Sequence, residues 1–349
     1  ANAYINLQTA LADSGCGEIW VAAGTYRPGE SGSRVFSFQL KNNLAIYGGF
    51  SGSETTREMR NWTANPTFLS GDLDADGNKN NNDSYHVVFS NGVNATAVLD
   101  GFTITGGYAN GGAASNNGAG VYNWASSPAY ANLIITSNVG TGDGGGMANL
   151  NGSSPTLTDI TLDHNSAAYG GGMINYPNSS PTLTRVNFIS NSASNHGGGM
   201  RNYNNSHPTL NDVTFQNNTA VGEGGGMVND ISSPTLTRVT FTGNSAAMGG
   251  GMHNNAGSSP ILNSVDFTSN QAARQGGGMR NSDHSSPILT NVTFSSNSAA
   301  DGGAVYNGSS SSPILTNVRL VGNNALGSGG GMHNSSSSPI LTNVIIMKN

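Results

Sequence analysis

The sequence of 349 residues predicts an all-β fold, a right-handed parallel β-helix in which each coil of the chain stacks on the coil before it. The main observation is a repeated unit, because one proline column recurs every 26 or 27 residues from Pro128 to Pro339. Apolar residues alternate within each unit, as in Val186-Asn187-Phe188, and a period of two residues is typical of strands. Proline and glycine at fixed places mark the turns between these strands.

Stacked units are expected to align equivalent residues in columns, with a rise of about 4.8 Å per coil. About nine regular coils follow residue 111, where Gly-Gly-Gly-Met-x-Asn recurs and an apolar-x-x-Asn motif ends each unit. Methionine, leucine and phenylalanine at fixed places are expected to point inward and form one core. The methionine column comprises Met147, Met173, Met200, Met227, Met252, Met279 and Met332.

The recurrent asparagines of both motifs could bind sugars or cations through their amides, but a structural role is favoured. Asparagine at a turn tolerates the left-handed backbone conformation and bonds to nearby backbone groups. Stacked copies can also hydrogen-bond to one another as an amide ladder.

Composition excludes several classes of protein. The chain carries 50 glycines, only 9% charged residues and a net charge of −6, and it has no run of Lys or Arg, so nucleic-acid binding has no electrostatic support. No apolar stretch has the length of a membrane span, so no transmembrane segment is expected. Cys16 is the only cysteine, which excludes an internal disulfide.

The N-terminal third lacks the regular repeat, so we divide the chain into residues 1–110 and the array of residues 111–349. The apolar spacing over residues 5–14 predicts a short helix that covers the open end of the spiral. Irregular coils with surface loops, including Ser51–Pro66, are expected to follow before the array begins.

One loop has the pattern of an EF-hand calcium site. Oxygen-bearing side chains fall at alternate positions, a glycine is sixth and a carboxylate is twelfth, which is the ligand order that Ca²⁺ takes in such loops. A solvated acidic loop is the alternative. The candidate ligands are Asp72, Asp74, Asp76, Asn78, Asn80 and Asp83.

Outward aromatic residues beside the Gly-Gly-Gly-Met strands form a second candidate site. Such rings could stack on sugars or pack into a partner protein, while scattered surface aromatics covered by neighbouring chains are the alternative. The candidates are Tyr122, Trp124, Tyr176 and Tyr203.

Two motifs resemble a known family. Gly302-Gly303-Ala304-Val305 together with Phe294-Ser295-Ser296-Asn297 is similar to the repeats of polymorphic outer-membrane proteins, which belong to bacterial surface adhesins and autotransporters. Most copies here carry Gly-Gly-Gly-Met instead. The resemblance covers roughly residues 100–349 and implies adhesion, cell-surface display or passive scaffolding, with other copies of the chain or other surface proteins as partners. It carries no catalytic residues.

The expected function is therefore an extracellular or cell-surface, adhesive or structural role without catalysis, in a bacterium. A filament subunit is one alternative, because the array stops at Asn349 in phase with the repeat and a further copy could stack there. A polysaccharide lyase or glycoside hydrolase is another, since such enzymes share the fold but need converging carboxylates. Acidic residues of the array are dispersed, and Glu223 with Asp230 is the best pair.

Overall fold

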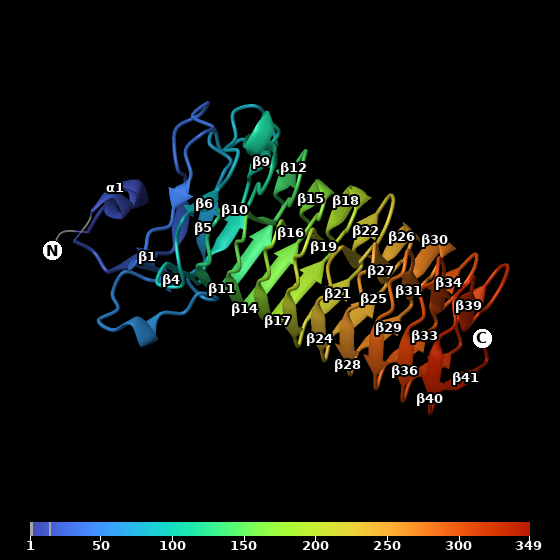
Figure 1. The fold of residues 1–349 in the computed structure, drawn as a ribbon. Helices are drawn as coiled ribbons and strands as arrows, with labels where there is room; N and C mark the ends of the chain where they lie inside the picture. The colour runs from blue at the N-terminus through green and yellow to red at the C-terminus, as the bar shows by residue number, and fades with distance from the viewer. Residues whose placement is uncertain (1–2, 14) are drawn as a thin grey trace.

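The computed structural model describes residues 3–13 and 15–349 and shows an all-β parallel β-solenoid of about 12 turns (Figure 1). The described strands pair only in parallel with their equivalents in the coils before and after. They form three sheets of 21, 11 and 9 strands, called here sheets A, B and C. The predicted fold class is confirmed, and the nine regular coils are preceded by irregular ones.

Sheet B holds the Gly-Gly-Gly-Met strands, and nine of its strands, from β10 onward, come from the regular array. Its strands are β3 (Phe38–Gln39), β6 (Val88–Asn91), β10 (Val121–Trp124), β13 (Met147–Leu150), β16 (Met173–Tyr176), β19 (Met200–Tyr203), β23 (Met227–Asp230), β27 (Met252–Asn255), β31 (Met279–Asn281), β35 (Val305–Asn307) and β39 (Met332–Asn334).

Sheet C has the fewest strands of the three sheets. Its strands are β9 (Tyr108–Ala109), β12 (Val139–Gly140), β15 (Ser166–Tyr169), β18 (Ser192–His196), β22 (Thr219–Ala220), β26 (Ser245–Met248), β30 (Gln271–Gln275), β34 (Ser298–Ala299) and β38 (Asn324–Ala325).

Sheet A contains two strand segments from most coils, one carrying the Leu column and one carrying the Phe column. Its strands are β1 (Glu18–Ala22), β2 (Gly24–Tyr26), β4 (Ala45–Phe50), β5 (Thr67–Ser70), β7 (Val98–Asp100), β8 (Thr103–Thr105), β11 (Ala129–Thr136), β14 (Thr156–Asp163), β17 (Thr182–Ile189), β20 (Thr209–Asn211), β21 (Thr214–Gln216), β24 (Thr235–Thr237), β25 (Thr240–Thr242), β28 (Ile261–Asn263), β29 (Asp266–Thr268), β32 (Ile288–Thr290), β33 (Thr293–Ser295), β36 (Ile314–Thr316), β37 (Arg319–Val321), β40 (Ile340–Thr342) and β41 (Ile345–Met347).

The chain bends between the two segments of sheet A at one residue per coil. This residue has a left-handed backbone, with φ of 50° at Asn132, 57° at Asp159 and 55° at Arg185. The bends therefore occur at residues with side chains as well as at glycine. The positions of proline and glycine in the sequence did not indicate these bends.

The interior consists of the predicted columns. Met147, Met200 and Met252 are fully buried, and five phenylalanines from Phe188 to Phe294 stack with ring centroids 4.6–4.7 Å apart. The distance equals the strand spacing, so each ring packs on the next without displacing the coil.

Two asparagine columns lie inside the solenoid and form the predicted ladders. From Asn123 to Asn334, each Nδ2 donates to Oδ1 of the next coil at 2.8–2.9 Å. From Asn138 to Asn349 the same bond measures 2.8–3.1 Å. The left-handed turn residue is the one before the second column, such as Ser190, so the turn role expected of asparagine belongs to its neighbour.

The glycine triplet allows sheets C and B to meet closely. A Cβ on Gly250 would lie 2.3 Å from the Gln271 carbonyl oxygen and 2.6 Å from that of Gly277. Both contacts are with backbone of the next coil, so a side chain at this position would push the coils apart.

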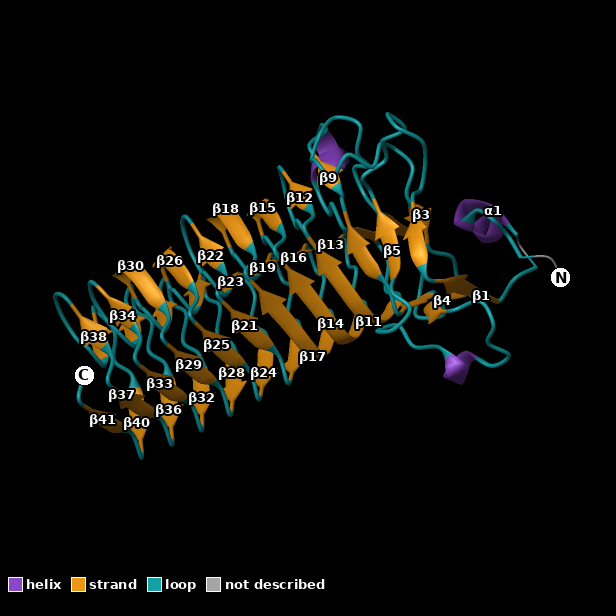
Figure 2. Ribbon diagram, turned by 180° about the vertical axis from the view of Figure 1, so that it is seen from behind, coloured by secondary structure: helices purple, strands orange, loops and turns teal. Residues whose placement is uncertain are grey.

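The N-terminal end carries the predicted helix, α1 (Leu7–Ala12), beside β1 and β3 (Figure 2). The Asn6 side chain caps it by accepting from the Gln8 N–H at 2.7 Å, and Leu7, Ala10 and Leu11 are buried in the main core. Residue 14 of the predicted range lies outside the described residues. Two short 3₁₀ helices, Arg57–Met59 and Ala113–Asn116, lie in loops.

Candidate functional site

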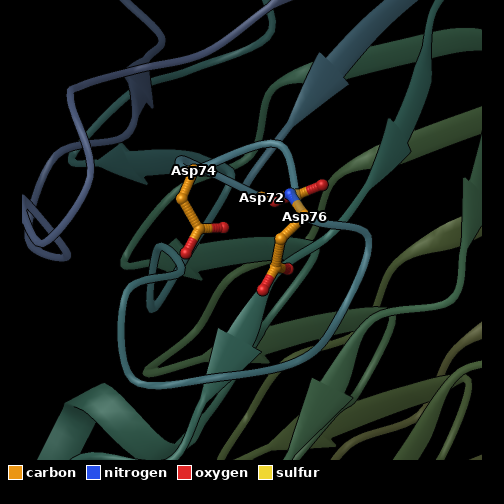
Figure 3. A group of neighbouring side chains, drawn as sticks. All are labelled: Asp72, Asp74 and Asp76. Carbon is orange, nitrogen blue, oxygen red and sulfur yellow. Dashed lines mark hydrogen bonds between the residues drawn. The ribbon is translucent and has the colours of Figure 1, made fainter.

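The acidic loop between β5 and β6 brings together three of its six candidate ligands. One carboxylate oxygen from each of Asp72, Asp74 and Asp76 lies within 4.8 Å of the others (Figure 3). Asp76 and Gly77 donate backbone N–H groups to Asp72, at 3.2 and 3.1 Å. The loop is therefore wrapped around the first carboxylate.

Amide side chains occupy part of the space between these carboxylates. Nδ2 of Asn80 donates to Asp76 at 3.0 Å and to Asp74 at 3.3 Å, and Nδ2 of Asn82 donates to Asp74 at 3.0 Å. The Asn82 bond lowers the pKa of Asp74 below its ordinary value. Asn78 lies at the edge, with its backbone N–H donating to Asp76 at 2.7 Å.

Asp83, the twelfth residue of the loop, is fully buried and is not one of the three clustered carboxylates. Burial raises the pKa of this carboxyl, and Oδ2 accepts from the Asn80 N–H at 2.9 Å. Oδ1 of Asp83 and Oδ1 of Asp74 are both buried with no hydrogen-bond partner among the described residues. Two buried carboxylate oxygens are thus left without a compensating donor, which is costly unless a cation or proton balances them.

The outward side chains of sheet B form the second candidate site. Met173 and Asn175 of β16 point inward, so Ile174 and Tyr176 point outward by the alternation of a strand. Tyr176 and Tyr203 stack at 5.0 Å between ring centroids. The structure therefore brings these two predicted residues together on adjacent coils.

Tyr122 and Trp124 lie at the N-terminal end of the same face. Tyr122 is only 4% exposed and stacks on His86 at 4.7 Å and Phe89 at 5.6 Å, so its ring belongs to a small apolar layer outside sheet B. Trp124 remains 42% exposed. Of this pair, only Trp124 offers surface to a ligand.

Arg201 lies among the central aromatics, which the sequence reasoning did not identify. Its guanidinium carbon is 4.4 Å from the Tyr169 ring centroid and 4.7 Å from that of Tyr203. Asp230 is 3.9 Å away, and Nε of Arg201 is buried without a hydrogen-bond partner in the described residues. Tyr176, Arg201 and Tyr203, called here the aromatic patch, are held by these contacts before any ligand arrives.

A second missed cluster surrounds Glu223. Oε2 of Glu223 lies 3.2 Å from Nδ1 of His253 and 3.8 Å from Nδ1 of His196. Nε2 of His253 is 3.0 Å from Ser282 Oγ, and Arg280 donates to that same oxygen at 2.8 Å. From the sequence, Glu223 was identified only as the partner of Asp230. Both histidines and Glu223 lie in columns whose residues vary from coil to coil, so no repeated pattern marked the cluster.

The charges within this cluster follow from burial and from the groups that face Glu223. Burial favours a raised pKa for Glu223, but the His253 hydrogen bond and the charges of the histidines and Arg280 outweigh it and bring the pKa to about 2. Burial lowers the pKa of the fully buried His253. Glu223 is thus ionised and His253 neutral near pH 7, and Ser282 is only 4% exposed.

Glu223 and Asp230, the best carboxylate pair for hydrolysis, are each occupied by partners on different elements. Glu223 is held by His253, and Asp230 faces Arg201. Glycoside hydrolysis requires one protonated carboxylic acid, which an ionised Glu223 does not supply.

These features define a parallel β-solenoid repeat protein with an aromatic patch and an acidic loop. No family model matches the chain, and neither the curated proteins nor the solved structures contain a match. Among the described residues, no helix is both long enough and apolar enough to cross a membrane.

Proposed function

We propose that this protein is a non-catalytic adhesive or structural solenoid of the bacterial cell surface or extracellular space. The observation that carries the proposal is the aromatic patch, which sits on a sheet whose interior is locked by asparagine ladders and stacked phenylalanines. A rigid support lowers the entropy that is lost when surface side chains bind a partner. The resemblance of the Gly-Gly-Ala-Val and Phe-x-x-Asn motifs to adhesin repeats supports the same role.

The aromatic patch can be tested by surface binding. The double variant Tyr176→Ala/Tyr203→Ala removes a stacked pair, while Trp20→Ala removes one ring of the stacked Trp20–Phe50 pair at the N-terminal end, whose centroids are 4.8 Å apart. Retention of purified protein on bacterial cells and on immobilised glycans should fall in the double variant and stay unchanged in the control. Equal retention of all three proteins would contradict an adhesive role for this face.

We also propose that the acidic loop binds Ca²⁺ as a structural ion. Asp72, Asp74 and Asp76 supply the oxygens, and the unpartnered Oδ1 atoms of Asp74 and Asp83 give the site a reason to take a cation. Hard oxygen ligands of this kind suit Ca²⁺. An ion would displace the Asn80 amide from between the carboxylates, since a donor group cannot face a cation.

Calorimetric titration with calcium chloride tests this site. Wild type should release or absorb heat and melt at a higher temperature with calcium, whereas Asp74→Asn/Asp76→Asn should do neither. Asp283→Asn is a suitable control, because Asp283 is an exposed carboxylate in the array. A wild-type protein with no heat and no change in Tm would refute calcium binding.

A further inference from the structure

A groove lies on the outer face of sheet A, where one insertion folds back over the coils. Residues 51–66 connect β4 to β5, and their C-terminal part lines a groove of about 550 Å³ together with residues of β5, β8, β11 and β14. This groove is separate from both sites described above, which lie on sheet B and in the loop before β6.

The floor of the groove is a row of outward residues, one from each of four coils. The parallel register places Phe68 beside Thr103, Thr103 beside Ile134, and Ile134 beside Thr161. Ile134 is 48% exposed, and the two threonine hydroxyls flank it. Apolar and hydroxyl groups thus alternate along the solenoid axis at the spacing of the coils, about 4.8 Å.

Trp62 lines the groove beside this row and is 41% exposed. Two glycines let it approach the sheet. A Cβ on Gly49 would lie 2.6 Å from the Trp62 Cα, and a Cβ on Gly101 would lie 3.4 Å from the Trp62 Cβ. Both glycines have a positive φ, 93° and 84°, so a side chain at either position would be strained as well as crowded.

A buried ion pair fixes the insertion that carries Trp62. Nη2 of Arg60 is 2.7 Å from Oδ2 of Asp100, and their side chains are only 9% and 13% exposed. The Arg60 guanidinium also lies 5.0 Å from the Tyr47 ring centroid and 4.9 Å from that of Trp62. Trp62 is therefore held from one side by charge and aromatic contacts, although it is a surface residue.

Polar groups follow Trp62 along the rim of the groove. Asn132 and Asp159 occupy the left-handed bend position of consecutive coils, in the same column as Gly101. Nδ2 of Asn132 donates to Oδ1 of Asp100 at 2.8 Å. The side-chain oxygen Oδ1 of Asn132 can then accept a hydrogen bond from a ligand. Asp159 accepts two bonds from Arg185, at 2.6 and 2.8 Å, so the rim carries a carboxylate whose charge is already balanced.

We propose that this groove binds a neutral, extended oligosaccharide along the solenoid axis. An exposed indole accepts the C–H face of a sugar ring, while amide, carboxylate and hydroxyl groups at its side bond to sugar hydroxyls. A repeating row of four coils suits a ligand with repeating units. The charges at the groove are paired within the protein, Arg60 with Asp100 and Asp159 with Arg185, so a charged glycan would gain no counter-charge there.

The inference deepens the adhesive function proposed above by naming a ligand class and a second surface. The probes are cellohexaose, xylohexaose and mannohexaose as neutral sugars, and a galacturonic acid hexamer as the charged one, each titrated by calorimetry. We expect at least one neutral hexamer to bind more tightly than the charged hexamer. Binding of none of the neutral sugars, or tighter binding of the charged one, would overturn the inference.

Two variants locate the binding. Trp62→Ala should weaken binding of the neutral sugar by about tenfold or more, which corresponds to one stacked ring. Asn132→Gly should also weaken it, and glycine tolerates the left-handed bend, as Gly101 shows in the same column. Trp20→Ala is the matched control, an exposed tryptophan outside the groove. Unchanged affinity in both groove variants, with far-UV circular dichroism like that of wild type, would overturn the site.

The proposals for the groove and for the aromatic patch can be refuted independently of each other. Sugar affinity that survives Trp62→Ala but is lost in Tyr176→Ala/Tyr203→Ala would place binding on the aromatic patch and reject the groove, with the adhesive role intact. Sugar affinity that depends on Trp62 in a protein that does not adhere through the patch would support the groove and reject the patch.

Discussion

The regular array and the N-terminal coils reach the same solenoid by different means. In the array each coil repeats the same inward residues, so Phe215, Phe241 and Phe267 have nearly the same surroundings. In the N-terminal coils the contacts are used once. Arg34, for example, donates to the carbonyl oxygens of Asp83 and Tyr108, at 2.7 and 2.9 Å, and so ties two loops to strand β9.

The two regions therefore differ in which residues they need for stability and in which residues can vary. Because repeated columns hold the array, its outward positions can change from coil to coil without loss of the fold. Single-use contacts hold the N-terminal loops, so there each of several residues matters individually. The acidic loop lies in this less regular part, and the Trp62 groove lies where an N-terminal insertion meets the first coils of the array.

The largest effect is expected from removing one ring of the phenylalanine stack. Phe241→Ala leaves a cavity between two rings that each lie 4.7 Å away, and it should lower the free energy of unfolding by about 4 kcal/mol. Phe241→Leu should cost only about 1 kcal/mol, because leucine occupies this column naturally at Leu162 and Leu320. Guanidinium unfolding measures both. Similar losses for the two variants would mean that packing in the column is not specific.

Replacing an asparagine of the buried ladders should have the next largest effect on the free energy of unfolding. Asn218 accepts from Asn191, donates to Asn244 at 3.0 Å and donates to the Phe188 carbonyl oxygen at 2.9 Å, all inside the core. Asn218→Ala leaves several buried groups unpaired and should cost about 3 kcal/mol. The control is Asn263→Ala, an exposed strand position in β28, with a change within about 0.5 kcal/mol. Equal losses of stability for the two variants would show that an asparagine in the ladder contributes no more than an exposed asparagine.

The comparison also explains what the sequence could predict. Inward columns were predictable because burial imposes the same residue type on each coil, and the ladders followed from stacking asparagines at one place. The bend residues were not predictable, because Asp159 and Arg185 adopt a left-handed backbone without being glycine. A local pattern of glycine and proline does not mark a left-handed residue that carries a side chain.

The candidate sites were predictable to different degrees. Asp72, Asp74 and Asp76 follow each other closely, so their grouping was implied by local spacing. Tyr122 points outward as predicted, but its burial was not foreseen, because the ring that covers it comes from His86 in the preceding coil. The Glu223 cluster and the Trp62 groove depend on outward residues of separate coils and on a docked insertion, and neither has a periodic signal.

Acid should affect the N-terminal part through His86. Burial lowers its pKa from 6.5 to about 4, against the opposing effect of its contact with the Gly118 carbonyl oxygen. As the pH falls, the unfolded chain therefore takes up the proton before the folded chain does. The contribution of neutral His86 to stability is fully present above pH 6.5 and is lost as the pH drops toward 4. This loss amounts to about 3 kcal/mol.

Unfolding at pH 7 and pH 4 measures the effect by difference. His86→Gln does not titrate, so wild type should lose about 3 kcal/mol more than this variant over the interval. His284→Gln, at a side chain that is 75% exposed in the array, should behave as wild type. An identical pH profile for wild type and His86→Gln would show that His86 gains solvent or a proton acceptor in the fold.

The smallest losses in the free energy of unfolding are expected when ion pairs are broken, and two pairs that differ in burial can be compared. Arg60→Ala removes the partner of the nearly buried Asp100 and frees the insertion 51–66, and it should cost about 2 kcal/mol, below the range for fully buried pairs because both groups keep some solvent. Arg185→Ala breaks a pair in the array whose side chains are 56% and 43% exposed, and its effect should lie within experimental error. Hydrogen exchange should quicken in residues 51–66 only for Arg60→Ala. If Arg185→Ala were the more damaging of the two, the bend column would depend on that pair, and the array would rely on individual contacts as the N-terminal coils do.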